Sequence, residues 1–162
     1  MGMTPLKGDE TPEKIIMLAY GMEAGLGLFY FTMTERIEDI GVVRVLKTLG
    51  EIEEKHKERL FKLYLTSRQE TLEKESFEAR IATEMMEGGF TIDEFLERNQ
   101  PAMETVADTL NVAMMLEAQA LDLYSRYSQK SRNESTRKVL YDIAEEEKAH
   151  LAALGDLLES RA

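Results

Sequence analysis

The sequence of 162 residues contains no cysteine and no tryptophan, and it has only three prolines. The absence of cysteine excludes disulfide bonds, thiol catalysis, cysteine-ligated zinc and any iron–sulfur centre. Scarce proline, combined with abundant Glu, Lys, Leu, Met and Ala, favours helices over strands. We therefore expect an all-α protein, and the length is enough for a single domain over residues 1–162.

Positive charge is also scarce, because 20 Lys and Arg residues face 31 Asp and Glu residues and leave a net charge of −11. This balance argues against nucleic acid or an anionic membrane as a partner, since both require a basic face. Residues 1–14 lack the apolar segment of a signal peptide, and no uninterrupted apolar run is long enough to span a bilayer. We expect a cytoplasmic protein.

Apolar residues recur at helical spacing in four long segments, at residues 12–38, 42–67, 102–130 and 134–160. Thr11, Asp39 and Asn133 are predicted to cap the first, second and fourth of these helices, and Asn99-Gln100-Pro101 to open the third. Residues 1–10 are expected to be a disordered lead. Residues 68–100 are predicted to form a crossover with short helices at 70–87 and 91–98.

The two halves of the sequence repeat each other. A shift of 94 positions places Glu23 on Glu117, the segment Glu53–His56 on Glu147–His150, and Leu60 on Leu154. Two similar helical hairpins joined by a long crossover predict a pseudo-symmetric four-helix bundle.

The repeated residues include both histidines of the chain, and each follows a glutamate by three positions. At that separation two side chains lie on one face of a helix, close enough to share a metal ion. A single Glu-x-x-His would be interpreted as a solvated helix face. Here both histidines carry the motif, and Glu23 and Glu117 each lie 30 residues before its glutamate, which predicts a site for two metals.

Charge balance supports this interpretation. A buried carboxylate without a partner costs several kcal/mol or stays protonated, and four facing one another repel. Two divalent cations would cancel the four negative charges. Carboxylate and imidazole ligands without thiolate suit iron, manganese or zinc. Four carboxylates and two imidazoles do not fill the coordination shells of two octahedral metal ions unless some carboxylates bridge or chelate. Open coordination positions would then remain for water, peroxide or dioxygen. Most of the flanking acidic residues, Glu51, Glu54, Glu145 and Glu146, are expected to be solvated.

On these motifs the chain resembles the ferritin-like di-iron carboxylate superfamily, and within it the rubrerythrin group, over about residues 12–161. The resemblance implies a ferritin-like four-helix bundle of two helical hairpins joined by a long, partly helical crossover. It also implies two iron ions, with Glu53 and Glu147 as bridging or chelating ligands and Glu23 and Glu117 as terminal ligands. His56 and His150 would each supply one nitrogen ligand.

Three departures from related proteins narrow the resemblance. Rubrerythrins usually carry an additional glutamate one turn after the third-helix ligand, and this chain has Ala120 there. That puts the carboxylate–histidine ligand switch of their peroxidase cycle in doubt. They also usually carry a rubredoxin domain, for which this chain has no cysteine. Bacterioferritins place a haem-binding methionine inside the first Glu-x-x-His, where this chain has Glu54 and Lys55, so no haem is expected.

The resemblance implies a non-haem di-iron oxidoreductase of the peroxidase or ferroxidase type. It would reduce hydrogen peroxide, or activate dioxygen while oxidising ferrous iron, with an external electron-donor protein, and it would form a homodimer. The six ligands would act through the metals, and Tyr30 and Tyr124 are candidates to hydrogen-bond them or to transfer electrons, the alternative being core tyrosines. Two other functions stay open: a non-catalytic iron-binding or iron-handling module acting with a partner protein, and a bundle that has lost its metals.

Overall fold

The structure is a computed structural model that describes residues 11–69, 71–88 and 103–161, with the side chains of residues 82–88 left undescribed. The predicted lead at residues 1–10 and the predicted short helix at 91–98 lie outside the described residues. The described helices are α1 (Pro12–Thr34), α2 (Ile40–Arg68), α3 (Lys74–Gly88), α5 (Val106–Lys130) and α6 (Glu134–Arg161).

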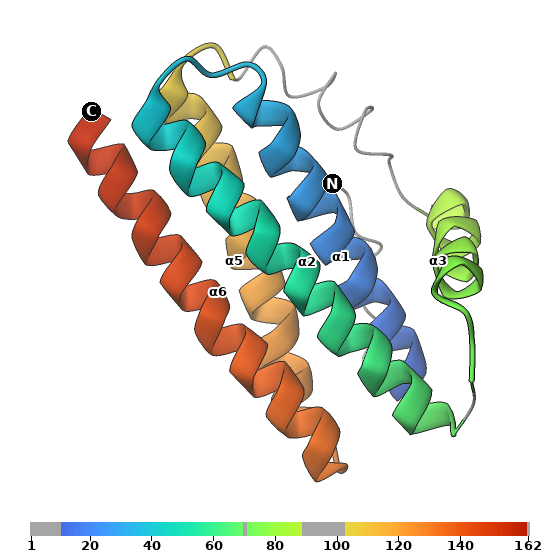
Figure 1. The fold of residues 1–162 in the computed structure, drawn as a ribbon. Coiled ribbons are helices and arrows are strands. Elements are labelled where there is room, and N and C mark those ends of the chain that lie inside the picture. Colours follow the sequence, from blue (N-terminus) through green and yellow to red (C-terminus); the bar gives the residue numbers. More distant parts are fainter. Residues whose placement is uncertain (1–10, 70, 89–102, 162) are drawn as a thin grey trace.

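The four long helices form two antiparallel hairpins that lie side by side, α1 with α2 and α5 with α6 (Figure 1). Between the hairpins, α1 packs against α5 and α2 packs against α6. Because α2 ends at one end of the bundle and α5 begins at the other, the connection between them has to run the length of the bundle (Figure 1). The predicted four-helix bundle with a partly helical crossover is confirmed.

The capping residues fix where most of these helices begin. Thr11 accepts a hydrogen bond from the Lys14 amide (3.3 Å), and Asp39 and Asn133 accept equivalent bonds from Val42 and Thr136, both at 3.1 Å. All three predicted caps are confirmed.

Three helix boundaries lie four residues from their predicted positions, and one of them is the start of α3, at Lys74 and not at residue 70. α1 ends at Thr34, four residues before the predicted end, and α5 begins at Val106 and not at residue 102. The start of α5 is set by a capping box in which Thr105 and Asp108 bond each other's backbone amides, both at 3.1 Å. This reciprocal pair outweighs the proline signal at Pro101.

The crossover helix α3 is fixed to the bundle by an aromatic cluster. The Phe77 side chain is fully buried and its ring lies 4.6–5.1 Å, centroid to centroid, from those of Tyr20, Phe61 and Tyr64. These partners come from α1 and α2, so α3 covers the outside of the first hairpin. The Tyr20 hydroxyl adds a 2.6 Å hydrogen bond to Glu78 on α3.

Helix α1 is apolar almost all round. Among the described helices it alone is long and apolar enough to cross a membrane. Its most apolar stretch of 18 residues has a mean hydropathy of 1.4, and 67% of that stretch is buried inside the bundle. Glu23 interrupts the apolar run in this helix, so the sequence shows no uninterrupted run of this length. A buried core helix passes the same test, so this finding is weak support for a membrane segment.

Candidate metal centre

All six predicted ligands meet in the middle of the bundle. Glu23 comes from α1, Glu53 and His56 from α2, Glu117 from α5, and Glu147 and His150 from α6. The four glutamates and His56 are fully buried, and His150 is 4% exposed. Two overlapping groups could each hold a metal ion, since their ligand atoms lie within 4.8 Å of one another.

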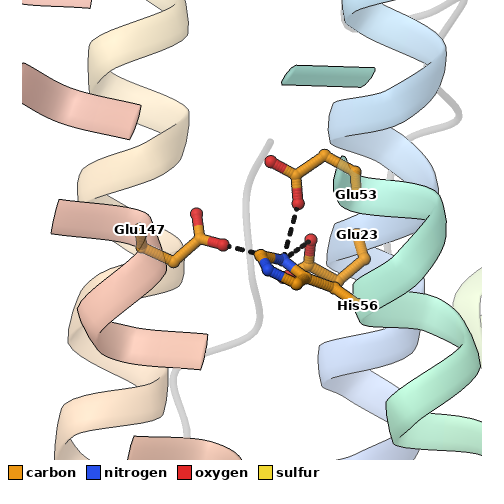
Figure 2. Close-up of side chains that lie close together, drawn as sticks. All are labelled: Glu23, Glu53, His56 and Glu147. Atoms are coloured by element: carbon orange, nitrogen blue, oxygen red, sulfur yellow. Dashed lines mark hydrogen bonds and ion pairs between the residues drawn. The ribbon is translucent and has the colours of Figure 1, made fainter. Parts of the chain in front are cut away.

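The first group surrounds the Nδ1 atom of His56. Glu53 Oε2 and Glu147 Oε1 each lie 3.0 Å from this nitrogen, and Glu23 Oε2 lies 3.3 Å from it. Figure 2 shows Glu53 and Glu23 approaching the imidazole from one hairpin and Glu147 from the other. The first group is therefore closed only by a residue of the second hairpin.

The second group surrounds Nδ1 of His150 in the same way. Glu53 Oε1 lies 3.1 Å from this nitrogen, Glu117 Oε1 3.3 Å and Glu147 Oε2 3.7 Å. Glu53 and Glu147 thus turn one oxygen toward each histidine. The two imidazole rings lie nearly parallel, 5.7 Å apart between centroids. Glu53 and Glu147 lie between the two groups, while Glu23 and Glu117 each belong to one group.

The two predicted tyrosines bond glutamates across the hairpin interface. Tyr30 on α1 donates to Glu117 on α5 at 2.5 Å, and Tyr124 on α5 donates to Glu23 on α1. Both tyrosines are fully buried. Burial, followed by the charges of Glu117 and Glu23 respectively, raises the pKa of each phenol well above its usual value, so both hydroxyls stay protonated donors.

When no metal ion is bound, the side chains of the cluster would hold additional protons. Burial, followed by the nearby Glu23, raises the pKa of Glu53 to about 10, and burial and Glu117 raise the pKa of Glu147 to about 8. Burial lowers the pKa of both histidines, but the surrounding carboxylates outweigh it and raise each pKa to about 12. At neutral pH both imidazoles are therefore charged, and Glu53 and Glu147 are mainly neutral.

The pKa of Glu117 moves the other way. Burial alone would raise it, but Glu147, His150 and Tyr30 together lower it below its usual value. Glu117 accepts a hydrogen bond from the Tyr30 hydroxyl and lies 3.3 Å from Nδ1 of His150, just as Glu23 contacts Tyr124 and His56. Opposite shifts among neighbouring carboxyl groups are characteristic of functional sites.

The oxygen and nitrogen atoms of the cluster are better suited to bind divalent cations than to satisfy one another by hydrogen bonds. Glu117 Oε2 and both carboxylate oxygens of Glu147 are buried without a hydrogen-bond partner among the described residues. One Nδ1–H cannot be donated at once to the three carboxylates that surround each imidazole. Buried polar atoms usually have a partner, and a cation shared by oxygen and nitrogen ligands supplies one.

Sequence reasoning missed one residue beside this cluster. Glu146, expected to be solvated, is 46% exposed and lies between Arg59 and the outer nitrogen of His56. Its position four residues before His150, on the turn that carries Glu147, was visible in the sequence, but its proximity to α2 was not. Ala120, the position of the additional rubrerythrin glutamate, is fully buried on α5 and offers no ligand.

Known proteins resemble this chain in sequence over part of its length and in fold. The rubrerythrin family matches residues 108–162, which include Glu117 and the second Glu-x-x-His. A ferritin-like–encapsulin shell fusion protein from Pyrococcus furiosus is 36% identical over 64 residues, which are 39% of this chain. The matched segment is 19% of that relative, so the chain spans about a fifth of its length.

Two solved structures share the fold. A hypothetical protein from Pyrococcus furiosus superimposes with a TM-score of 0.70 at 20% identity, covering 94% of this chain and 91% of its own. KatB, a manganese catalase from Anabaena, superimposes with a TM-score of 0.69 at 19% identity, covering 98% and 76%. The predicted resemblance to rubrerythrin and to the ferritin-like fold is confirmed.

Proposed function

We propose that this rubrerythrin-like, ferritin-fold chain is a di-iron oxidoreductase that reduces hydrogen peroxide, or activates dioxygen while oxidising ferrous iron. One observation carries the proposal: Glu53 and Glu147 each present one oxygen to each of two buried histidines. That placement suits two carboxylates shared by a pair of metal ions. An isolated ion pair or a core hydrogen bond would not require it twice.

The residues divide into three roles in this proposal. Glu53 and Glu147 would bridge the two ions, and Glu23 and Glu117 would each complete one position. His56 and His150 would coordinate through Nδ1, the nitrogen that faces the carboxylates. Four carboxylates balance two divalent cations, so the loaded cluster is neutral within an apolar core. Iron is the proposed metal, and manganese and zinc suit the same ligands.

A pair of redox metals would supply two electrons to a bound oxygen species, and the protein groups would control where that occurs. The hydrogen bonds of Tyr30 and Tyr124 hold Glu117 and Glu23 in place and leave both hydroxyl protons on the phenols. Ala120 supplies no further carboxylate, so the six residues are the whole proposed ligand set. An external electron-donor protein, a homodimer and a cytoplasmic location complete the proposal.

A second function is favoured by one finding. One relative of this chain is a ferritin-like–encapsulin shell fusion protein, which by its name joins a ferritin-like part to a shell protein. The alternative is therefore a non-catalytic iron-binding module that acts with a partner. Both functions need the same metal centre, and only the first requires turnover.

Iron titration of the metal-free protein under anaerobic conditions tests the centre. We expect two ferrous ions per chain in the wild type and loss of both high-affinity ions in Glu147→Ala, since Glu147 contacts both histidines. Glu145→Ala, an exposed neighbour paired with Lys148, is the control and should still bind two. No iron uptake by the wild type would overturn both functions.

Peroxide assays separate the two functions. Rapid oxidation of the di-ferrous protein by peroxide or dioxygen, followed by steady-state turnover with an electron donor, supports the oxidoreductase. A di-ferrous protein inert to both oxidants would overturn it and leave the binding module.

A further inference from the structure

The two histidines of the centre differ in what lies behind them. The outer nitrogen of His56, Nε2, lies 3.5 Å from Glu146 Oε2. Glu146 is on α6, and Arg59 on α2 forms an ion pair with the same oxygen. A chain of three side chains therefore runs from the half-exposed surface to one of the two proposed metal positions.

The geometry at His56 fixes which nitrogen needs a partner. Nδ1 faces Glu23, Glu53 and Glu147, so this is the nitrogen that would bind the metal. The proton of the neutral ring must then be on Nε2. His56 is fully buried, and its Nε2 has no hydrogen-bond partner among the described residues. Glu146 is the described acceptor within reach, at a distance that a small movement would shorten to a hydrogen bond.

Among the described residues, no carboxylate lies behind His150 in the way that Glu146 lies behind His56. The shift that places His56 on His150 places Ile52 on Glu146, and an isoleucine side chain cannot accept a proton. Arg59 falls on Ala153 in the same way. The six ligands are repeated, but the residues behind the histidines are not. This asymmetry makes the two positions chemically unequal.

We propose that Glu146, held by Arg59, is a positioning residue that accepts the Nε2 proton of His56 and so makes the His56 metal position the tighter of the two. The proposal rests on the metal centre proposed above. A carboxylate behind a ligating histidine fixes the ring and its tautomer and raises its basicity as a ligand. Removing such a partner typically weakens metal binding about 10- to 100-fold.

Titration of the metal-free full-length chain with Co²⁺ tests the proposal without any turnover. The wild type should bind two Co²⁺ ions with unequal affinities. Glu146→Gln should weaken the tighter position about 10- to 100-fold and leave the other unchanged. Arg59→Met should weaken the same position by a smaller factor, because Glu146 remains but is no longer held.

Glu145→Gln is the matched control. It makes the same change of charge on the same helix, at a side chain of the same exposure (46%) that pairs with Lys148. It should bind Co²⁺ as the wild type does. In the proton NMR spectrum of the Co²⁺-loaded chain, the shifted imidazole N–H signal of His56 should exchange with water faster in Glu146→Gln than in either reference.

Three outcomes would overturn the proposal. Glu146→Gln that titrates like the wild type shows that the carboxylate does not support His56. Equal weakening by Glu145→Gln shows a general effect of surface charge. A wild type that binds no Co²⁺ and no Fe²⁺ overturns the metal centre itself, which separates that failure from failure of the positioning role alone.

Discussion

The hydroxyl of Tyr30 donates a 2.5 Å hydrogen bond to Glu117, 87 residues farther along the chain and on the opposite hairpin. Tyr124 makes the reciprocal bond to Glu23. Each hairpin therefore supplies a terminal glutamate and a tyrosine that holds the glutamate of the other. The two bonds join α1 to α5 beside the metal centre, so the same interactions serve stability and ligand placement.

Replacing Tyr30 by phenylalanine should destabilise the metal-free protein by about 1.5–3 kcal/mol, the usual contribution of a hydrogen bond to a charged group. Urea unfolding measures this change. Tyr124→Phe should cost a similar amount, because its environment repeats that of Tyr30. Tyr141→Phe is the control, and its 55% exposed side chain should give a change near zero. Equal stability of Tyr30→Phe and the wild type would show that water replaces the bond.

The metal-free protein should lose stability as the pH rises from 6 to 9. The pKa values of His56 and His150 rise from 6.5 to about 12 on folding, and those of Glu53 and Glu147 rise from 4.5 to about 10 and 8. Raised values mean that the folded chain holds more protons than the unfolded chain. This contribution is complete below the unfolded values and is lost as the pH approaches the folded ones.

Urea unfolding at pH 6 and pH 9 with a chelator present measures this dependence. Glu53→Gln should show a shallower decline, because the amide does not titrate. Metal ions reverse the trend, since they displace the same protons and bind more tightly as the pH rises. Higher stability of the metal-free wild type at pH 9 than at pH 6 would contradict the assigned protonation states.

Replacing each of two helical glycines by alanine should change the stability of the protein in opposite directions. A Cβ atom added at Gly50 would lie 2.9 Å from the Phe31 ring, closer than packed atoms approach, so Gly50→Ala should destabilise by about 1–3 kcal/mol. At Gly155 the nearest atom is the flexible end of Met114 at 3.8 Å. Gly155→Ala should therefore stabilise by up to about 1 kcal/mol through helix propensity. Thermal unfolding of both variants checks the contrast, which equal shifts would contradict.

Replacing Phe77 by alanine should release α3 from the bundle. The ring is fully buried against three aromatic residues, and truncations of this kind cost about 3–5 kcal/mol. We expect faster proteolysis within residues 74–88 and little change in metal binding, since the ligands are on other helices. Loss of metal binding in this variant would show that the crossover supports the centre directly.

The sequence was sufficient to predict the bundle and the gathering of the six candidate ligands. Helical spacing located the buried apolar faces of the helices. The repeat placed Glu23 and Glu117 at the same distance along the sequence from the two Glu-x-x-His pairs, which indicated that all six residues belong to one site. Helices that each have one apolar face can bury those faces in only a few arrangements, of which the four-helix bundle is one. The caps at Thr11, Asp39 and Asn133 were also predictable, because capping depends on adjacent residues.

The contacts between hairpins could not be predicted. Helical spacing places Tyr30 on the same face of α1 as Glu23, but it does not say which ligand the hydroxyl bonds, and the structure pairs Tyr30 with Glu117 on α5. Glu146 was interpreted as a solvated acid, because helical periodicity does not give the position of Arg59 on α2. Rotation and registry of packed helices decide such pairs, and one sequence does not encode them locally.

The reciprocal contributions of the hairpins bear on how such a chain can evolve. Each hairpin carries a glutamate, a Glu-x-x-His and a tyrosine, and each group of ligands is closed by the other hairpin. One hairpin paired with an identical copy would supply the same six ligands. Joining two copies in one chain releases them from the requirement to stay identical. The second hairpin has Glu146 where the first has Ile52, and two identical hairpins could not have acquired this difference.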